Sequence, residues 1–581
     1  MAEYRMEHPN PQFQRENWMN LNGEWDFAFD FGMSGLERKW YRTNEEIQAN
    51  FTQKIIVPFC PESTLSGIGY TDFMPAVWYR REVLLTQEQV KGRVILHFGA
   101  VDYETTVFVN EKEVGKHIGG YSSFEFDITN DVECGKNVVV VCVKDDVRSG
   151  LQPRGKQSGA YYSRACDYTR TTGIWQTVWL EFVPKSYVKN IRYYADIEEK
   201  CFNVDVSVYG SGNLMLAAFY KGNIQGTVEK HVKGDGNKLV LPVDELYLWE
   251  CGNGRLYDIK IEYVSDRDGT IDVVSSYAGM REVMLDGYKF LLNGKSVFQR
   301  LVLDQGFYRD GIYTAPTEET LWKDIKLAKS LGFNGARLHQ KIFEPRFLYY
   351  CDKEGYMVWE EQGNWGLDLS NPEVFLNFVP EWLEVVERDM NHPSIIGWCP
   401  FNETWDYNGR RQNNKILANI YKMTKALDST RPCIDTSGHY HVMTDIYDIH
   451  NYRQSVEEFK ECYDVFDEST GFREEHPNRQ QYTPGLPIFI SEYGGIKWNV
   501  DESRTDAWGY GEEPKTENEF LERFRGLTNV LLDNPHIMGF CYTQLYDIEQ
   551  ETNGLCDYDR CPKFDIETIR NINIRKAAIE D

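Results

Sequence analysis

Hydrophobic and polar positions alternate with a period of two through the first part of the chain. Trp25, Phe27 and Phe29 alternate with Asp26, Ala28 and Asp30, the pattern of a strand with one buried face. A short apolar run at 137–143 lies between turn signals. Because such segments recur with Gly and Asn between them, we expect a β-sandwich over residues 1–183.

A second β-rich block follows at residues 184–282. Val204, Val206 and Val208 alternate with polar residues, and the apolar residues of 257–263 do the same. This pattern suits an immunoglobulin-like β-sandwich. Its two cysteines, Cys201 and Cys251, do not by themselves establish a bridge.

From residue 283 the pattern changes to short apolar runs that alternate with amphipathic helices. Thr317 is a helix cap before the stripe Leu321, Ile325 and Ala328, and 520–531 repeats this spacing. Strand candidates lie near 298–303, 334–338, 356–359, 394–399, 432–435, 445–449, 487–491 and 537–542. Strands and helices in this order predict a C-terminal (β/α)8 TIM barrel over residues 283–581.

Composition narrows the classes of function. A net charge of −27 opposes binding to phosphate backbones, so we expect no nucleic-acid partner. No stretch approaches the roughly 20 apolar residues of a membrane span, and the opening residues lack a signal-peptide core, so we expect a cytoplasmic protein without a membrane partner. The 13 cysteines include no C-x-x-C pair, which indicates reduced thiols rather than a disulfide framework or zinc site.

Two glutamates follow apolar runs where barrel strands are expected to end. Residues 394–401 lead into Asn402 and Glu403, and residues 488–491 lead into Glu492. Glycoside hydrolysis needs two such carboxyls across one bond. On spacing alone they are equally well explained as buried ion-pair partners, and the pair 360–361 is a third strand-end acid that stays open.

Two motifs carry a family resemblance. NHPSIIGWCPFNETW (391–405) resembles the acid/base signature of glycoside hydrolase family 2, which contains β-galactosidases and β-glucuronidases, and PIFISEYGG (487–495) resembles its nucleophile signature. NLNGEWDF (20–27) and the segments 119–121 and 172–175 are similar to the family's sugar-binding sandwich. The resemblance implies a retaining exo-β-glycosidase with Glu403 as general acid/base and Glu492 as nucleophile.

The resemblance also implies sugar-binding residues. Asn402 matches the Asn that hydrogen-bonds the sugar 2-hydroxyl, although a plain loop amide is the alternative. Tyr452 matches a tyrosine whose hydroxyl contacts the nucleophile, with core packing as its alternative. Asp167 lies in a stretch similar to the sandwich loop that reaches the barrel mouth, where an acid grips sugar hydroxyls; a surface turn explains it nearly as well.

Further positions follow barrel strands. His339 lies near a sugar-contacting histidine of the family, or it is structural. Asp304 ends the first strand and could meet the sugar, and Gln544 falls at a pocket wall. Arg337 is expected to brace the carboxylates and keep Glu492 ionised.

Aromatic residues beside these strands could stack on a sugar ring. Trp365, Trp498 and Trp508 lie in the expected loops. A hydrophobic lid is an equally good account of all three. For the proton chemistry, we expect the negative charge of Glu492 to raise the pKa of Glu403.

The expected sugar is a neutral hexoside such as a β-galactoside. The Asn-x-Lys-Gly motif that receives the carboxylate in family β-glucuronidases is replaced here by Glu551, Thr552, Asn553 and Gly554. A β-glucuronidase or β-galacturonidase is the alternative if another cation substitutes, and an inactive carbohydrate-binding protein is the alternative from another class.

No cofactor is expected. Some family members bind magnesium beside the acid/base, but the segment 360–365 lacks the histidine expected among the ligands, so we predict no required metal. The expected partner is an oligosaccharide or glycoconjugate substrate, and a homo-oligomer is possible.

Overall fold

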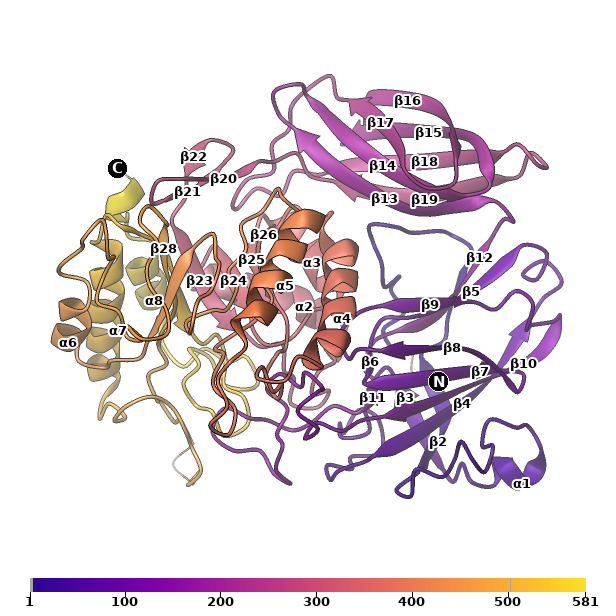
Figure 1. Cartoon of the computed structure of the whole chain (residues 1–581), viewed down its shortest axis with the longest axis horizontal. Helices are drawn as coiled ribbons and strands as arrows, with labels where there is room; N and C mark the ends of the chain where they lie inside the picture. Colours follow the sequence, from indigo (N-terminus) through magenta and orange to yellow (C-terminus); the bar gives the residue numbers. More distant parts are fainter. Residues whose placement is uncertain (1–3, 502, 581) are drawn as a thin grey trace.

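The computed structural model describes residues 4–501 and 503–580, and it contains two β-sandwiches and a barrel in chain order (Figure 1). Both sandwiches, coloured indigo to magenta, lie on the same side of the orange and yellow barrel. The predicted fold class is therefore confirmed.

The first sandwich packs two antiparallel sheets against each other. One sheet contains, in spatial order, β1 (Trp18–Asn20), β12 (Val178–Val183), β5 (Arg93–Phe98) and β9 (Phe124–Asp127). The other contains β3 (Gln53–Val57), β2 (Gly23–Phe29), β4 (Ala76–Leu85), β10 (Gly135–Lys144), β7 (Glu104–Val109) and β8 (Lys112–Ile118). The short pair β6 (Val101–Asp102) and β11 (Gly173–Ile174) and the helix α1 (Glu45–Gln48) complete it. Trp25 and Phe27 lie buried between the sheets, as their alternation predicts.

The second sandwich is the immunoglobulin-like part. Its three-stranded sheet contains β13 (Tyr187–Asp196), β14 (Cys201–Tyr209) and β17 (Asn237–Pro242). Its four-stranded sheet contains β16 (Asn223–Lys233), β15 (Ser211–Tyr220), β18 (Tyr257–Ser265) and β19 (Ile271–Ala278). Val204, Val206 and Val208 share one core with Ile259 and Ile261 of the facing sheet, so the period-two pattern marks the buried faces correctly.

A small meander leads from this sandwich into the barrel. It consists of β20 (Val283–Asp286), β21 (Lys289–Leu292) and β22 (Lys295–Ser296). The parallel barrel sheet follows, in spatial order β26 (Ile395–Cys399), β25 (Met357–Glu361), β24 (Gly335–Leu338), β23 (Gln299–Asp304), β29 (Ile537–Thr543), β28 (Ile488–Gly494) and β27 (Tyr447–Asn451).

The strand predicted at 432–435 is not a regular strand. This segment is bound to its neighbour by isolated bridges, with Ile434 N donating to Trp398 O at 2.9 Å and Ser437 N donating to Phe401 O at 2.8 Å. Pro432 has no N–H to add to a ladder. The segment nevertheless occupies the gap between β26 and β27 and completes the barrel wall.

Helices cover the outside of the barrel (Figure 1). They are α2 (Glu318–Ser330), α3 (Pro345–Glu354), α4 (Val374–Asp389), α5 (Asn414–Leu427), α6 (Val456–Glu461), α7 (Glu517–Leu532), α8 (Ile566–Asn573) and the 3-10 helix η1 (Ala578–Glu580). Thr317 caps α2 by accepting from Thr320 N, and Leu321, Ile325 and Ala328 are buried, so the predicted cap and stripe are confirmed.

A long loop of the first sandwich, residues 145–172, reaches the barrel mouth. Arg154 N donates to Trp365 O at 2.8 Å, and Thr169 N donates to Glu549 Oε1 at 3.0 Å. The loop is therefore fixed to segments that follow two different barrel strands. It forms part of the wall around the strand ends, where the chemistry is expected.

Within residues 4–501 and 503–580, no helix combines the length and apolarity needed to cross a bilayer. All 13 cysteines are free thiols, including Cys201 and Cys251. The immunoglobulin-like sandwich is therefore held by its apolar core rather than by a bridge.

Candidate active site

Glu403 lies just beyond the carboxyl end of β26. Every residue of that strand is buried, and the chain then turns through Glu403 itself, whose φ is 41°. The turn is held by Glu403 N, which donates to Ser437 O at 2.8 Å. A left-handed conformation at a residue other than glycine costs of order 1 kcal/mol or more, and here it places the side chain in a cavity of about 600 Å³.

Glu492 lies on β28, with both carboxylate oxygens occupied. Arg337 donates to Oε1 at 2.7 Å, and the hydroxyl of Tyr452 donates to Oε2. Burial raises the pKa of Glu492, but the positive charges of His450 and Arg337 outweigh this effect, so the pKa lies below its usual value. Glu492 is thus held ionised and in a fixed orientation.

The imidazole of His450, on β27, lies between the two glutamates. Its Nδ1 is 2.7 Å from Glu403 Oε1 and 3.4 Å from Glu492 Oε2. One oxygen of each carboxyl group and one nitrogen of the imidazole all lie within 4.8 Å of one another. Carboxyl groups about 5–5.5 Å apart are the arrangement of retaining glycosidases.

The pKa of Glu403 moves in the opposite direction to the one expected. Burial raises it, but the hydrogen bond and charge of His450, helped by His439 and Lys156, lower it to about 2. The expectation that Glu492 would raise the pKa of Glu403 is therefore wrong. The reason is that the nearest charged neighbour of Glu403 is a histidine and not the second carboxylate.

Arg337, at the end of β24, connects the acidic groups. Its Nε donates to Glu361 Oε2 at 2.8 Å, its second nitrogen contacts Glu492, and its third donates to Asn402 Oδ1. Glu361, the third strand-end acid, is fully buried and also accepts from Gln340 N at 2.9 Å. Glu361 therefore balances the arginine and does not face the cavity.

The same contacts bear on the metal site implied by the family resemblance. Arg337 and the Gln340 N–H occupy both oxygens of Glu361. Glu361, an oxygen donor of the type magnesium prefers, is thus already saturated and fits a divalent cation poorly. We derive no catalytic step through a metal.

Asn402 is oriented by its neighbours but keeps one free group. Its Oδ1 accepts from Arg337, while its backbone N–H donates to Asn364 Oδ1 at 2.8 Å. Its Nδ2 is buried and has no hydrogen-bond partner among the residues that the structure describes. A buried amide donor without a partner is costly, so this N–H is available for a hydroxyl of a bound ligand.

Tyr452 is placed where the resemblance implies. Besides its bond to Glu492, its hydroxyl lies 3.1 Å from Thr543 Oγ1, and its ring stacks on Tyr510 with centroids 3.5 Å apart. Both contacts restrict the ring. Its hydroxyl therefore stays on the carboxylate.

The cavity beside Glu403 is shared between the barrel and the first sandwich. Asp167 and Trp365 line it together with Glu403, and Asp167 also pairs with Arg154 at 3.2 Å. The structure thus brings the predicted loop acid and one predicted tryptophan to the same cavity as the first glutamate.

Two predicted residues at the strand ends have other partners. Asp304 accepts hydrogen bonds from Tyr546 and from Gly306 N. Gln544 donates to Asn553 Oδ1 at 2.9 Å and accepts from Gln305. These contacts tie neighbouring loops together.

His339 lies beside Glu361 and near Glu492. Its Nδ1 is 2.8 Å from Glu361 Oε1 and 3.9 Å from Glu492 Oε1. Burial, with Lys156 as the next cause, lowers the pKa of His339 well below its usual value, so the ring is neutral. It can therefore serve as a neutral hydrogen-bonding group beside Glu361 and Glu492.

The other tryptophans take part in aromatic packing. Trp498 contacts the rings of Phe520 and Phe564 at 5.9 and 5.8 Å, and Trp508 contacts Tyr510 at 5.0 Å. For Trp498, these contacts favour the hydrophobic-lid account over ring stacking on a sugar.

Lys156 is a site residue that the sequence did not indicate. It lies on the sandwich loop, is 7% exposed, and its Nζ is 4.1 Å from the centre of the Trp365 ring. No carboxylate oxygen of the described residues lies within 4.0 Å of this ammonium group. Burial lowers its pKa, but Cys166 and three nearby glutamates outweigh that effect and raise it. Lys156 is therefore a charged, unpaired cation near the glutamates.

Glu551 lies in the same region. It accepts from the Tyr168 hydroxyl and from Asn553 Nδ2 at 2.9 Å. Burial raises its pKa, although Lys156 opposes the shift. The carboxyl group of Glu551 is thus buried near Lys156, whose positive charge favours its ionised form.

His450 is the second residue that the sequence analysis missed. It lies two positions before Tyr452, so the two side chains have the spacing of one face of a strand. Its two carboxylate contacts, Glu403 and Glu492, come from other segments of the chain, and only the fold brings them together. The available signal was the sequence DIHNY (448–452), in which His450 lies two residues before Tyr452.

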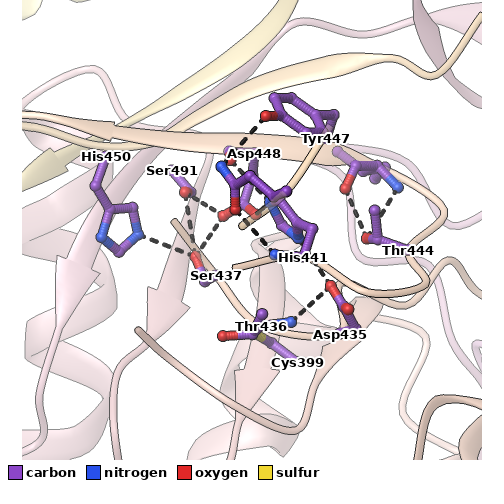
Figure 2. A network of polar contacts seen from close by, with 12 residues as sticks. Cys399, Asp435, Thr436, Ser437, His441, Thr444, Tyr447, Asp448, His450 and Ser491 are labelled. Atoms are coloured by element: carbon purple, nitrogen blue, oxygen red, sulfur yellow. Dashed lines mark hydrogen bonds and ion pairs between the residues drawn. The ribbon is translucent and has the colours of Figure 1, made fainter. Parts of the chain in front are cut away.

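Behind His450 lies a buried polar network (Figure 2). His450 Nε2 is 3.0 Å from Ser437 Oγ, and both Ser437 and Ser491 donate to Asp448 Oδ2. On the far side of Asp448, His441 Nε2 lies 3.0 Å from Asp448 Oδ1. The network fixes one edge of the imidazole that touches both glutamates.

Two carboxylates at the strand ends of a parallel β/α barrel are the arrangement that glycoside hydrolases use. Three family models match the chain: the sugar binding domain of glycosyl hydrolases family 2 at residues 18–184, glycosyl hydrolases family 2 at 186–281, and its TIM barrel domain at 283–574. The chain belongs to glycosyl hydrolases family 2.

Similar proteins include β-glucuronidases. That of Rattus norvegicus is 26% identical over 453 residues, covering 71% of this chain and 67% of its own; that of Homo sapiens is 26% identical over 447 residues, with the same shares. A solved β-glucuronidase of Ruminococcus gnavus in complex with D-glucuronic acid superposes with a TM-score of 0.79 at 19% identity, covering 98% of this chain and 100% of that one. The latter likeness shows the fold.

Proposed function

We propose that the protein is a retaining exo-β-glycosidase in which Glu492 is the nucleophile and Glu403 the general acid/base. One observation carries this proposal: His450 contacts both carboxyl groups, and one oxygen of Glu403 lies within 4.8 Å of one oxygen of Glu492. A nucleophile needs to be ionised and fixed, and Arg337 and Tyr452 hold Glu492 in that state.

In the first step, Glu492 attacks the anomeric carbon and the glycosidic bond breaks. The electrons of that bond go to the departing oxygen, which takes a proton delivered by Glu403. In the second step, Glu403 removes a proton from water, the resulting hydroxide attacks the anomeric carbon, and Glu492 leaves as a carboxylate. The free Nδ2 of Asn402 supports this proposal, because it can bind a sugar hydroxyl during both steps.

For the sugar, we favour a β-linked uronic acid such as a glucuronide over the neutral hexoside expected from the sequence. The relatives named above are β-glucuronidases. Lys156 supplies a buried cation without a carboxylate partner within 4.0 Å in the described residues. A charge-assisted hydrogen bond to a substrate carboxylate contributes about 1.5–3 kcal/mol. Lys156 would then replace the missing lysine of the Asn-x-Lys motif.

A neutral hexoside remains the second candidate, and Glu551 is the observation that favours it. Glu551 and Asn553 occupy the positions where the family motif has Asn and Lys. A carboxylate at this position can accept from a sugar hydroxyl but repels a substrate carboxylate. The raised pKa of Glu551 weakens this repulsion without removing it.

The test is hydrolysis of p-nitrophenyl β-glycosides by the wild type, Glu403→Gln and Glu492→Gln. Glu360→Gln is the matched control: burial and the neighbouring Asp389 raise the pKa of this strand-end acid well above normal, so glutamine closely imitates it. We expect cleavage of the glucuronide, abolished in Glu492→Gln and retained in the control. The first product should be the β-anomer by NMR.

Three outcomes would overturn parts of the proposal. Preference for a galactoside or glucoside would favour the neutral candidate. An α-anomer as first product would exclude the retaining mechanism. Inactivity on every glycoside, with sugar binding intact, would favour the carbohydrate-binding alternative.

A further inference from the structure

The ring of His450 has a fixed proton on its rear nitrogen. Asp448 is ionised: burial raises its pKa, but His441 outweighs this effect and holds the pKa at about 2. A serine hydroxyl has one hydrogen, and that of Ser437 is donated to Asp448 Oδ2. Arg337 Nη1 lies 3.5 Å from His450 Nε2, but its two hydrogens are donated at shorter distances to Glu492 Oε1 and Ser491 O. Toward His450, Ser437 accepts, so His450 Nε2, 3.0 Å away, carries a hydrogen (Figure 2).

The front nitrogen then shares one proton with Glu403. His450 Nδ1 and Glu403 Oε1 are 2.7 Å apart, which is a hydrogen-bond distance and requires one hydrogen between the two atoms. Either Glu403 is protonated and the imidazole neutral, or Glu403 is a carboxylate and the ring is an imidazolium. Both forms contain the same number of protons, so the pair titrates as a unit.

The charges around the pair determine where that proton rests. The groups that face the pair are Glu492 on β28, Arg337 on β24, Asp448 on the histidine's own strand, His439 and Lys156. Burial lowers the pKa of His450, but the charges of Glu492 and Glu403 outweigh it and raise it. The resting proton therefore lies on the ring, and Glu403 alone is a poor acid.

We propose that His450 stores the proton that Glu403 delivers to the departing glycosidic oxygen, so that the working acid is the His450–Glu403 pair. This inference rests on the proposed glycosidase function and deepens it. His450 is a positioning and proton-storing residue, because it acts through Glu403 and does not touch the sugar.

The proton balance closes over the catalytic cycle. In the first step the proton passes from His450 Nδ1 to Glu403, whose carboxyl group rotates and gives it to the leaving oxygen; the imidazolium becomes neutral imidazole. Esterification of Glu492 removes the negative charge nearest to Nδ1 after that of Glu403. The ring is then less basic while Glu403 acts as base. In the second step Glu403 takes a proton from water and returns it to Nδ1 as Glu492 regains its charge.

The experiment compares His450→Asn with the wild type on aryl β-glycosides of the sugar that the wild type cleaves. Phenol is a poor leaving group and needs the acid, whereas 2,4-dinitrophenolate leaves without it. We expect kcat/KM to fall about 100-fold or more for the phenyl glycoside, and far less for the dinitrophenyl glycoside. His231→Asn, an exposed histidine of the second sandwich paired with Asp266, is the control.

The pH dependence of kcat/KM is a second readout, and it would not change if His450 had only a structural role. In the wild type the pair keeps its proton until the raised pKa of His450 is passed, so the alkaline limb of kcat/KM lies above pH 6.5. In His450→Asn only a carboxyl group holds the proton, and the limb moves to lower pH. An equal loss of kcat/KM with both leaving groups would overturn the proposal. So would an alkaline limb that His450→Asn leaves at the same pH.

Ser437→Ala and NMR separate this proposal from the function on which it rests. Without the Ser437 acceptor, Nε2 is no longer held as a donor, and we expect a smaller shift of the alkaline limb in the same direction. With ¹⁵N-labelled histidine, the His450 signal should report an imidazolium at pH 6.5 and a lower pKa in Glu492→Gln. A neutral ring at pH 6.5 would contradict the proposal, whereas an inactive wild type with an imidazolium would contradict only the glycosidase function.

Discussion

The ammonium nitrogen of Lys156 lies 4.1 Å from the centre of the Trp365 ring. Lys156 belongs to the first sandwich, and Trp365 follows strand β25 of the barrel. An indole face attracts a cation by about 0.5–2 kcal/mol without neutralising it. The contact therefore holds a positive charge beside the cavity in a form that an anionic ligand can still use.

Replacing Lys156 by methionine tests this interpretation. The variant keeps the apolar stem over Trp365 and removes the charge, so kcat/KM for a β-glucuronide should fall about 10- to 100-fold, while that for the corresponding glucoside stays within a few-fold. Lys326→Met is the control, because Lys326 also lies over a tryptophan, Trp322, at 5.1 Å but on the exposed helix α2. Equal losses on both sugars would show that the charge does not select the substrate.

Removing the hydroxyl of Tyr452 should slow the reaction without unfolding the protein. Tyr452→Phe leaves the stacking on Tyr510 in place but deletes the bond to Glu492. The loss of one charge-assisted hydrogen bond predicts a fall in kcat of about 10- to 100-fold. Tyr193→Phe, which loses a buried 3.0 Å bond to Ser276 in the second sandwich, should keep kcat. Unchanged turnover in Tyr452→Phe would mean that Arg337 alone orients the nucleophile.

Arg337→Met should reduce both stability and turnover. It leaves Glu361 and Glu492 buried without their common cation, and breaking a buried ion pair costs about 3–5 kcal/mol. Arg300→Met breaks the partly buried pair with Glu580 on the same barrel, far along the sequence from Glu403 and Glu492. Thermal unfolding should show a loss for both variants, whereas only Arg337→Met should lose turnover in the fraction that remains folded. Similar activity losses in both would contradict a specific role for Arg337.

Glu381 predicts a pH-dependent stability. It lies on α4 and accepts from Tyr121 N of the first sandwich at 2.6 Å. Burial raises its pKa from 4.5 to about 8. A raised folded-state pKa adds stability that is fully present below pH 4.5 and is lost as the pH rises toward 8.

Glu381→Gln should remove this dependence. Its new amide nitrogen faces Gln362, whose buried Oε1 has no partner among the described residues and can accept it after a flip. Chemical denaturation should therefore find the variant close to wild type at pH 4.5 and more stable at pH 8. Glu373→Gln, an exposed glutamate at the start of the same helix, is the control. A constant difference between variant and wild type across this range would contradict the assignment.

The sequence predicted most of the architecture because local signals there agree with the fold. The Thr317 cap and the stripe from Leu321 to Ala328 are properties of one helix, and alternation around Val206 is a property of one strand. The segment at 432–435 shows the limit of this approach. Its residues have an apolar pattern, yet Pro432 and the short length leave only bridges.

From the sequence, site residues could be predicted only where they lie in a recognisable motif. Glu403 and Glu492 each follow a recognisable apolar strand, and the structure places them face to face. His450 and Lys156 reach the glutamates from a different strand and a different sandwich, so no spacing in the sequence marks them. The wrong direction for the pKa of Glu403 follows directly from missing His450.

The loop of residues 145–172 places one proposed sugar-selecting charge, that of Lys156, in a different part of the gene from the proposed catalytic glutamates. The proposed catalytic residues, Glu403 and Glu492, are encoded after position 300, whereas the proposed sugar-selecting charge is encoded at position 156. Mutation or recombination in the first sandwich can therefore alter which sugar is accepted while the codons for the cleavage machinery stay untouched. On the proposed role of Lys156, we expect an exchange of this loop between family members to change the sugar preference on an unchanged barrel.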